Sequence, residues 1–420
     1  MMFKFLHAAD IHLDSPLKGL EAHEDAPVAA IRGATRRAFD NLIDLAIEEE
    51  VAFVLIAGDL YDVDWKDYNT GLFFVDRMGR LNRAGIRVFI VTGNHDAAGQ
   101  ITRTMPLPGN TTRFSAGNPE SVRLDDLGVI IHGRSYSSPS VKENLVLDYP
   151  RQEAGYFNIG LLHTSLNGRE GHADYAPCAP DDLKSKGYDY WALGHVHQRE
   201  IVSEDPWIVF PGNLQGRHIR ETGAKGATLV TVEDGRVIEI EPRELDVLRW
   251  AVCPVDLSGC ETVPAVYQAV RQTFEQELDR AAGKALALRL ILTGKSPVHG
   301  ELLDRTAQLT EEFRGIAAAL GDLWLEKTSF KTSRTVSLEE IVGEDSPVAG
   351  LLHSIAQLEL DHNAILELVP ELAVLKTKLP PEILGGDEPL LDSSPGRIAE
   401  LRSEVQELLI AKLLRQRGVE

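Results

Sequence analysis

Short apolar segments, each long enough for one buried strand, alternate with amphipathic segments up to about residue 245. Phe3–Ala8 and Val51–Ala57 are two such strands, and between them Val28–Glu50 carries apolar residues at three- and four-residue spacing, the period of a helix. The same order repeats in the helix Leu72–Arg83 and the strand Arg87–Val91. This alternation is typical of a layered α/β fold, in which helices cover the faces of a sheet.

The segment Ala97–Pro150 is less regular, because it is rich in Pro, Gly, Ser and Asn, and only Val129–His132 is predicted there as a strand. The strands predicted after it are Phe157–Leu162, Tyr188–Leu193, Trp207–Phe210, Ala227–Val232 and Val237–Glu241, the last two joined by the turn Glu233–Gly235.

Three domains are expected, with the first ending near Pro242–Asp246 and therefore covering residues 1–245. Residues 246–335 are predicted to form a small α+β domain, and residues 336–420, rich in Leu and Glu, a C-terminal helical region. The elements predicted in the small domain alternate strand and helix: Leu248–Val255, Val263–Ala282, Ala285–Thr293, Gly300–Leu320 and Leu323–Lys327.

The composition indicates a globular protein in a reducing compartment. Apolar residues make up 43% of the 420 residues and charged residues 25%, and the three cysteines form no Cys-x-x-Cys pair. We find no secretory signal and no apolar run near the roughly 18–20 residues that span a bilayer, so we expect a cytoplasmic protein without a membrane partner. The net charge of −21 argues against nucleic-acid binding unless metal ions or a local basic patch supply the attraction.

Polar side chains gather just after the carboxyl ends of the predicted strands. Because α/β sheets collect binding groups at that edge, we expect these side chains to meet in one site. The set consists of Asp10 and His12 after the first strand, Asp59 after the second, Asn94 and His95 after the third, then His163, His195 and His197.

Oxygen and nitrogen ligands without cysteine fit hard or borderline divalent ions. One carboxylate shared by two ions holds them about 3.5–4 Å apart, the arrangement used in phosphoester hydrolysis. Each motif alone is more often an ordinary turn or helix cap, but five clusters in series, each at a strand end, favour a two-metal site.

This ordered series of Asp-x-His, Gly-Asp, Gly-Asn-His-Asp, His and Gly-His-x-His blocks resembles the calcineurin-like metallophosphoesterase superfamily over about residues 3–240. The chain is similar to the SbcD-type DNA-repair exonucleases in Phe5–Leu13 and in Pro211–Asn213 with Arg217 and Lys225. The segment Gly212–His218 is similar to the YhaO-like branch of these nucleases. The resemblance implies a β-sandwich flanked by helices, followed by a capping domain.

The resemblance also implies the ligands of each ion. Asp10, His12, Asp59 and His197 would hold one metal, and Asp59, Asn94, His163 and His195 the other, with Asp59 bridging. Manganese is the implied ion, although ligand type alone also allows iron, zinc or cobalt.

Two cations would lower the pKa of a bound water and generate a hydroxide nucleophile near neutral pH. His95 has no ligand role and lies next to Asn94, so we predict it to be the general acid or a donor that stabilises the transition state. Asp62 would orient and stabilise protonated His95, and the alternative for Asp62 is a cap of its turn. His7, inside the first strand, is expected to be a core histidine or one that supports a ligand.

Basic residues near the last histidine block are candidates for phosphate contacts, with a solvated hairpin as the alternative. These candidates are Arg217, His218, Arg220 and Lys225, and weaker DNA-contact candidates are Arg134, Tyr136, Arg103 and Arg113.

An apolar stripe of Ile398, Leu401, Val405 and Leu408 predicts either plain helix packing or a tethered helix that lies in a groove of another protein. The resemblance implies an SMC-like coiled-coil ATPase of the SbcC/YhaN kind as that partner, and typically a homodimer. The chain has no Gly-rich Lys-Ser/Thr phosphate loop, so ATP binding would have to come from the partner.

Three functions remain open from the sequence. The first is a metal-dependent DNA exonuclease, with endonuclease activity as an addition, and the second is another phosphoesterase acting on phosphoproteins, nucleotides or small phosphodiesters. The protein phosphatases of the superfamily place an Arg after the second Asp of their Gly-Asp block, whereas Val63 follows Asp62 here, which favours a diester. The third is a non-catalytic scaffold, disfavoured because clustered unpaired carboxylates and imidazoles are costly without metal.

Overall fold

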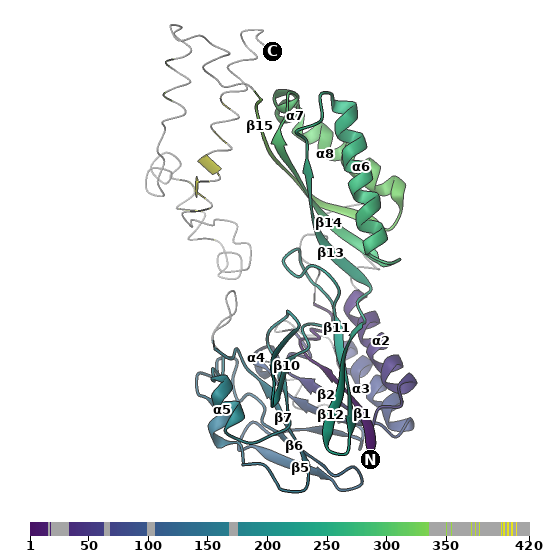
Figure 1. Ribbon diagram of the computed structural model, residues 1–420, viewed down its shortest axis with the longest axis vertical. Helices are drawn as coiled ribbons and strands as arrows, with labels where there is room; N and C mark the ends of the chain where they lie inside the picture. Colours follow the sequence, from purple (N-terminus) through teal and green to yellow (C-terminus); the bar gives the residue numbers. More distant parts are fainter. Residues whose placement is uncertain are drawn as a thin grey trace. The chain divides into compact units, whose positions relative to one another are not determined.

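The structure is a computed structural model that describes residues 1–15, 17, 33–62, 68–98, 106–167 and 175–335, and single positions after 335 (Figure 1). The chain divides into two compact units. The first consists of Met1–Cys253, Glu275–Arg289 and Leu320–Lys327, and the second of Pro254–Phe274, Leu290–Ala319 and Thr328–Glu420.

Two six-stranded sheets form most of the first unit. In the first sheet, with order β12-β11-β1-β2-β3-β4, the strands β1 to β4 are parallel, and β11 is antiparallel to β1 and β12. Its strands are β1 (Met2–Ala8), β2 (Phe53–Ala57), β3 (Arg87–Val91), β4 (Thr111–Arg113), β11 (Gly226–Glu233) and β12 (Arg236–Glu244).

The second sheet has the order β5-β6-β7-β8-β10-β9, and its central strands β6, β7, β8 and β10 are parallel. Its strands are β5 (Glu120–Leu124), β6 (Val129–Gly133), β7 (Phe157–His163), β8 (Tyr190–Gly194), β9 (Glu200–Glu204) and β10 (Trp207–Phe210).

Aromatic and branched side chains from facing strands of both sheets fill the space between them. Phe5 of β1 stacks on Phe53 of β2 with ring centroids 5.0 Å apart, and the edge of Tyr190 from β8 meets Phe5 at 5.2 Å. Each such buried side chain contributes roughly 1.5–3 kcal/mol. This shared core holds the two sheets face to face.

Helices cover the outer faces of the sheets (Figure 1). The helices α2 (Ala34–Glu48) and α3 (Tyr68–Arg83) bury Phe39, Leu42, Phe74 and other apolar residues in a cluster that also contains residues of β1 and β2. On the second sheet, the short helix α5 (Pro180–Lys184) and the 3-10 turn η2 (Leu145–Asp148) share a cluster with Trp191. The predicted β-sandwich flanked by helices is confirmed.

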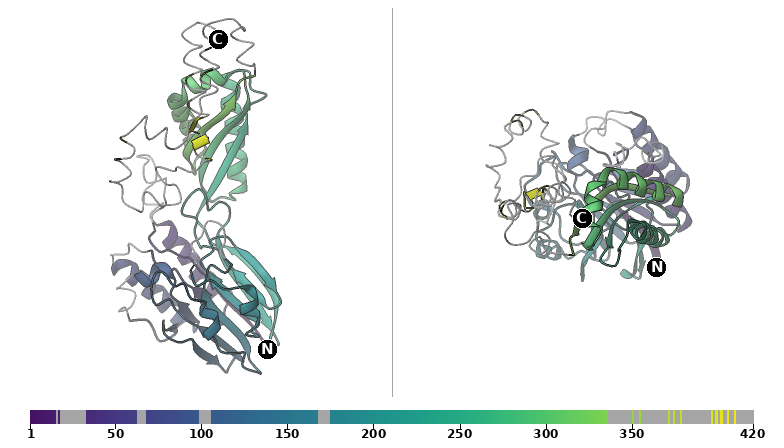
Figure 2. Two further views of the ribbon diagram at one scale, coloured as in Figure 1. Left: turned by 90° about the vertical axis from the view of Figure 1, so that its left-hand side faces the viewer. Right: turned by 90° about the horizontal axis from the view of Figure 1, so that it is seen from above.

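The strands β13 (Leu248–Asp256), β14 (Ala285–Lys295) and β15 (Leu323–Ser333) form a third sheet, and Figure 2 shows them side by side. The helix α6 (Val263–Arg280) lies between β13 and β14 in the sequence. The single helix predicted at Gly300–Leu320 is wrong, because α7 (His299–Asp304) ends before α8 (Thr306–Leu320) begins. Apolar spacing continues across this break, so periodicity alone does not predict it.

The strands β4, β5 and β9 were absent from the sequence prediction, and all three lie at sheet edges. Edge strands face solvent on more than one side, so they lack the apolar run that marks a central strand. Two predicted parts lie outside the described residues. They are the start of the helix Val28–Glu50 and, apart from single positions, the C-terminal region 336–420, which includes Leu408.

Candidate metal centre

The predicted ligands lie where strands of both sheets end. Asp10 and Asp59 follow β1 and β2 within two residues, His163 is the last residue of β7, and His195 directly follows β8. Asn94 begins the short helix α4 (Asn94–Ala98) after β3. The two sheets pack face to face, so these strand ends meet in one place.

The backbone at these positions is held in an uncommon conformation. Asp10, His12, Asp59 and His195 all have positive φ values, of 50°, 46°, 50° and 104°. Non-glycine residues rarely adopt this region, and such strain persists where the surrounding structure imposes it, commonly at functional sites.

Asp10, His12 and His197 form the first ligand cluster, in which one potential ligand atom of each residue lies within 4.8 Å of the others. Nε2 of His12 lies 3.9 Å from Oδ2 of Asp59. His12 is fully buried, and neither of its ring nitrogens has a hydrogen-bond partner among the described residues. Burial, reinforced by the nearby Arg217 charge, holds the pKa of His12 well below its usual value, so its imidazole is neutral and has a free lone pair.

Asp59, His163 and His195 form the second cluster with the same spacing. Nδ1 of His163 lies 2.9 Å from the Ala57 carbonyl oxygen, which accepts its proton. Nε2 of His163 lies 3.0 Å from Oδ1 of Asn94 and 3.5 Å from Oδ2 of Asp59. Three atoms with lone pairs therefore converge, and either a proton or a cation must lie among them.

Without a metal ion, a proton on His163 would lie between its ring and Asp59, and the pKa values of both residues reflect this. Burial lowers the pKa of His163, but the charge and hydrogen bond of Asp59, the charge of Asp10 and the hydrogen bond to Ala57 together outweigh burial and raise the pKa to about 9. Burial likewise opposes ionisation of Asp59, yet the neighbouring imidazoles hold its pKa well below the usual range. A divalent cation would replace that proton with a larger charge, so the donor set fits a metal ion.

Gly93 is required by the close approach of two ligands. A Cβ atom at this position would lie 2.3 Å from Oδ1 of Asp59 and 2.8 Å from Cε1 of His163, closer than atoms can pack. The backbone N–H of His95 donates to the same Asp59 oxygen at 3.0 Å. The Gly-Asn-His-Asp loop therefore closes directly over the Asp59 carboxylate.

His95 and Asp62 form a pair beside the first cluster. Nδ1 of His95 lies 2.8 Å from Oδ1 of Asp62, and the His95 and His12 rings meet edge to face at 4.8 Å. Burial lowers the pKa of His95, but the contact with Asp62 and the charges of Asp59 and Asp62 together outweigh burial and raise that pKa above the usual value. Ser15 donates to the other oxygen of Asp62 at 2.7 Å, which fixes the carboxylate.

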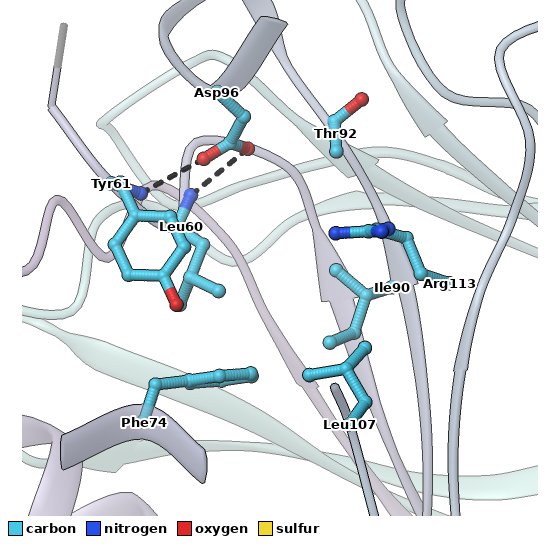
Figure 3. A pocket seen from close by; sticks show the side chains of 8 residues that line it. All are labelled: Leu60, Tyr61, Phe74, Ile90, Thr92, Asp96, Leu107 and Arg113. Carbon is cyan, nitrogen blue, oxygen red and sulfur yellow. Dashed lines mark hydrogen bonds between the residues drawn. The ribbon is translucent and has the colours of Figure 1, made fainter. Parts of the chain in front are cut away.

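Asp96, whose role was not assigned from the sequence, joins two of the ligand loops (Figure 3). Its buried carboxylate accepts backbone N–H groups of Leu60 at 3.2 Å, Tyr61 at 2.9 Å and Gly93 at 3.1 Å. Burial raises the pKa of Asp96 to about 6. Asp96 is the fourth residue of the Gly-Asn-His-Asp motif, and its place in this motif is the feature of the sequence that could have indicated a role in the site.

Beside Asp96 lies a small, mostly apolar cavity of about 20 Å³, shown in Figure 3. Phe74 of α3, Ile90 of β3 and Leu107 contribute to its apolar lining, and Arg113 of β4 also lines it. Arg113, predicted as a weak DNA contact, is half-buried beside this cavity, whereas Arg103 lies outside the described residues.

Of the predicted phosphate contacts, Arg217 lies nearest the His95–Asp62 pair. Its Nη1 is 3.6 Å from Oδ2 of Asp62 and donates to Ser15 at 3.3 Å. Lys225 donates to the His197 carbonyl oxygen at 3.2 Å, His218 faces the carboxylate of Glu221 at 3.4 Å, and Arg220 is exposed.

Tyr136 and Arg134, two of the weaker candidates, contact other residues of the protein. Tyr136 is 2% exposed, and its ring meets His163 edge to face at 5.4 Å. This burial argues against the DNA contact predicted for Tyr136. Arg134 forms an ion pair with Asp148 at 2.6 Å. His7 is a buried histidine whose ring nitrogens lie 3.0 Å from the Tyr190 hydroxyl and 3.1 Å from the Leu193 carbonyl oxygen, as expected for a core residue.

The protein has two packed mixed sheets, and their strand ends present Asp, Asn and His side chains in the order typical of a metallophosphoesterase. The chain belongs to the calcineurin-like phosphoesterase family, which it matches over residues 3–199. This family uses a dimetal centre. Residues 250–333 match the middle domain of the metallophosphoesterase YhaO.

Among individual proteins, the chain is similar to the metallophosphoesterase YhaO of Bacillus subtilis, with 39% identity over 297 residues, which cover 70% of this chain and 72% of that protein. It is also similar to the DNA double-strand break repair protein Mre11 of Sulfurisphaera tokodaii, with 25% identity over 70% of this chain and 74% of that protein. Mre11 of Methanopyrus kandleri is 23% identical over 70% of this chain and 66% of that protein.

None of the helices in the described part of the chain combines the length and the hydrophobicity that a membrane span needs.

Proposed function

We propose that this protein is a metal-dependent DNA exonuclease that hydrolyses phosphodiester bonds and acts in DNA repair, with endonuclease activity as an addition. The observation that carries the proposal is the His95–Asp62 pair, 2.8 Å apart, beside two clusters of metal-binding groups. Asp59 belongs to the second cluster, and its Oδ2 lies 3.9 Å from Nε2 of His12 in the first. The similarity to two archaeal Mre11 proteins supports DNA as the substrate.

The residues that would hold the two metals are Asp10, His12, Asp59 and His197 for one, and Asp59, Asn94, His163 and His195 for the other. When bound, two divalent ions activate water and stabilise the charge of the reacting phosphate. We propose manganese, because the ligand set of oxygen and imidazole donors without cysteine accepts it.

The protein's own groups would handle the leaving oxygen. Burial lowers the pKa of His95, but the nearby carboxylates raise it overall, which favours the protonated imidazole, and Oδ1 of Asp62 lies 2.8 Å from Nδ1. The Nε2–H of His95 is then the proton that can pass to the leaving 3′ or 5′ oxygen of a phosphodiester. Asp62 keeps the ring oriented and stabilises its positive charge.

A polyanion must approach a protein of net charge −21, so local positive charge is needed. Arg217, with 13% of its side chain exposed, lies next to the His95–Asp62 pair, and exposed Arg220 follows on the same loop. These two residues would neutralise the phosphates that flank the cleaved bond.

The test is incubation of the purified protein with end-labelled single- and double-stranded DNA, with manganese or with EDTA, beside the His95→Asn variant. Shortening of the DNA that requires manganese and His95 supports the proposal. Hydrolysis of a chromogenic phosphodiester with intact DNA would identify a small-diester phosphoesterase instead, and inactivity toward both would favour a scaffold role.

An SMC-like coiled-coil ATPase is the proposed partner, bound through the C-terminal segment. Deletion of Ser394–Glu420 should leave hydrolysis of the chromogenic diester unchanged and weaken association with the ATPase in co-purification. Association that survives the deletion would contradict this role of the segment. Light scattering of the purified chain distinguishes a monomer from the proposed homodimer.

A further inference from the structure

Glu221, in the loop between β10 and β11, is a buried carboxylate surrounded by hydrogen-bond donors. Its Oε1 lies 2.6 Å from Nδ1 of His197. Its Oε2 accepts the side-chain N–H of Asn213 at 2.9 Å and the backbone N–H of Arg217 at 2.7 Å. Only 6% of Glu221 is exposed, so solvent does not compete for these contacts.

We propose that Glu221 is a positioning residue for the metal ligand His197. Because the carboxylate accepts the Nδ1 proton, His197 is held in the tautomer whose Nε2 carries the lone pair. That Nε2 lies 3.9 Å from Oδ1 of Asp10, on the side of the first ligand cluster. A carboxylate that orients a ligating histidine in this way strengthens metal binding, and its loss typically costs 10–100-fold in affinity.

The site requires an acceptor on both sides, since Oε1 faces Nδ1 of His197 and Oε2 accepts two N–H groups, from Asn213 and Arg217. A glutamine at position 221 could accept from His197 with its oxygen, but its NH₂ group would then face the N–H donors of Asn213 and Arg217. Because an NH₂ group only donates, the N–H groups of Asn213 and Arg217 would lose their acceptor. The positive charge of Arg217 lies 3.7 Å from Oε1, an attraction that a neutral glutamine would lose.

The loop that carries Glu221 is itself anchored. Gln215 donates to the Leu248 carbonyl oxygen at 2.6 Å and accepts the Val247 N–H at 2.9 Å, and the Trp250 indole donates to the Gly216 carbonyl oxygen at 3.0 Å. These contacts keep the loop in place, so a carboxylate at position 221 has little freedom to move away from His197.

The alternative is that Glu221 only stabilises the loop between β10 and β11 through its hydrogen bonds to Asn213 and Arg217. A purely structural residue would change the stability of the metal-free protein without changing metal affinity. The inference rests on the proposed metal centre but not on DNA as the substrate, so metal binding is the measurement that separates the two.

The test is isothermal titration of the metal-free full chain with Mn²⁺ for the wild type, Glu221→Gln and, as a matched control, Glu239→Gln on exposed β12. We expect Glu221→Gln to weaken one of the two manganese sites by roughly 10–100-fold, and the control to leave both unchanged. The absorption spectrum of the Co²⁺-loaded protein should change in the same variant only. Unchanged Mn²⁺ affinity together with a lower melting temperature of the metal-free protein would overturn the inference.

Glu221→Asp covers the case in which Glu221→Gln does not fold, because it keeps the charge and shortens the reach by one methylene. It should also lose Mn²⁺ affinity, since its carboxylate no longer reaches Nδ1. In a His197→Asn background, the effect of changing Glu221 on Mn²⁺ affinity should vanish, and an additive effect would overturn the inference. A wild type that binds manganese but leaves DNA intact would contradict the proposed substrate and leave this result standing.

Discussion

Nδ1 of His95 lies 2.8 Å from Oδ1 of Asp62, and Ser15 donates to the second oxygen of the same carboxylate. His95 contacts the ligand residues through its backbone N–H, which donates to Asp59, and through its ring, which meets that of His12 edge to face. Nδ1 of His95 is occupied by Asp62, so we assign the pair to proton transfer and not to metal binding. Changes in the pair should therefore alter the chemistry, and changes in the clusters should alter metal binding.

Replacement of His95 by Asn should lower kcat by roughly 10²–10⁴-fold, because the leaving oxygen loses its proton donor. The backbone N–H that donates to Asp59 remains, so affinity for manganese should stay close to that of the wild type. Steady-state hydrolysis of a phosphodiester and titration with Mn²⁺ measure the two quantities. Wild-type turnover in His95→Asn would contradict the assignment of the general acid.

The Asp62→Asn variant should shift the alkaline limb of the pH–rate profile to lower pH. The hydrogen bond and charge of Asp62 raise the pKa of His95, so the protonated acid is present at low pH and is lost as the pH rises through that pKa. Without the carboxylate, the pKa of His95 falls and the loss begins earlier. The profile of kcat, recorded at saturating Mn²⁺, tests this, and an unmoved limb would show that Asp62 does not set the protonation of His95.

Asp59→Ala should abolish both metal binding and activity, because Asp59 belongs to the second cluster and its Oδ2 lies 3.9 Å from Nε2 of His12 in the first. Elemental analysis after dialysis against Mn²⁺ measures the bound metal. Asp189→Ala serves as a control, since this carboxylate accepts the backbone N–H of Asn158 away from the ligands. Retention of two equivalents of metal by Asp59→Ala would rule out the bridging role.

The Gly93→Ala variant should lower manganese affinity at least tenfold and destabilise the fold by about 1–3 kcal/mol, because the added methyl group would overlap Asp59 and His163. Gly315→Ala is the matched control. It lies within α8 with open space around its Cα, so the same change should stabilise the protein by about 0.5–1 kcal/mol. Denaturant unfolding of the metal-free proteins and Mn²⁺ titration distinguish the two variants.

Asp96→Ala should reduce the free energy of unfolding by about 3 kcal/mol or more, because three backbone N–H groups would lose their acceptor inside the protein. The metal-free protein shows this loss in urea denaturation. Asp96→Asn should destabilise less, since its amide oxygen still accepts. Equal stability of Asp96→Ala and the wild type would mean that the two loops hold together without this carboxylate.

Much of the metal centre follows from sequence alone. In parallel sheets, the carboxyl ends of neighbouring strands lie at one edge, so polar residues placed just after β1, β2 and β3 are brought together by local patterning. The ligand types, without cysteine, restrict the metal class, and the helix and central-strand positions follow from apolar periodicity. The edge strands β4, β5 and β9 could not be predicted in this way, because exposure removes the pattern.

The tertiary structure alone decides which distant groups contact one another. His163 reaches Asp59 because the second sheet packs on the first, and no local pattern states the offset between two stacked sheets. The same holds for Glu221, which meets His197 only after the chain returns through β10. Hydrogen bonds of this kind depend on positions to within a few tenths of an ångström, and only the packed core of the folded chain sets positions that finely.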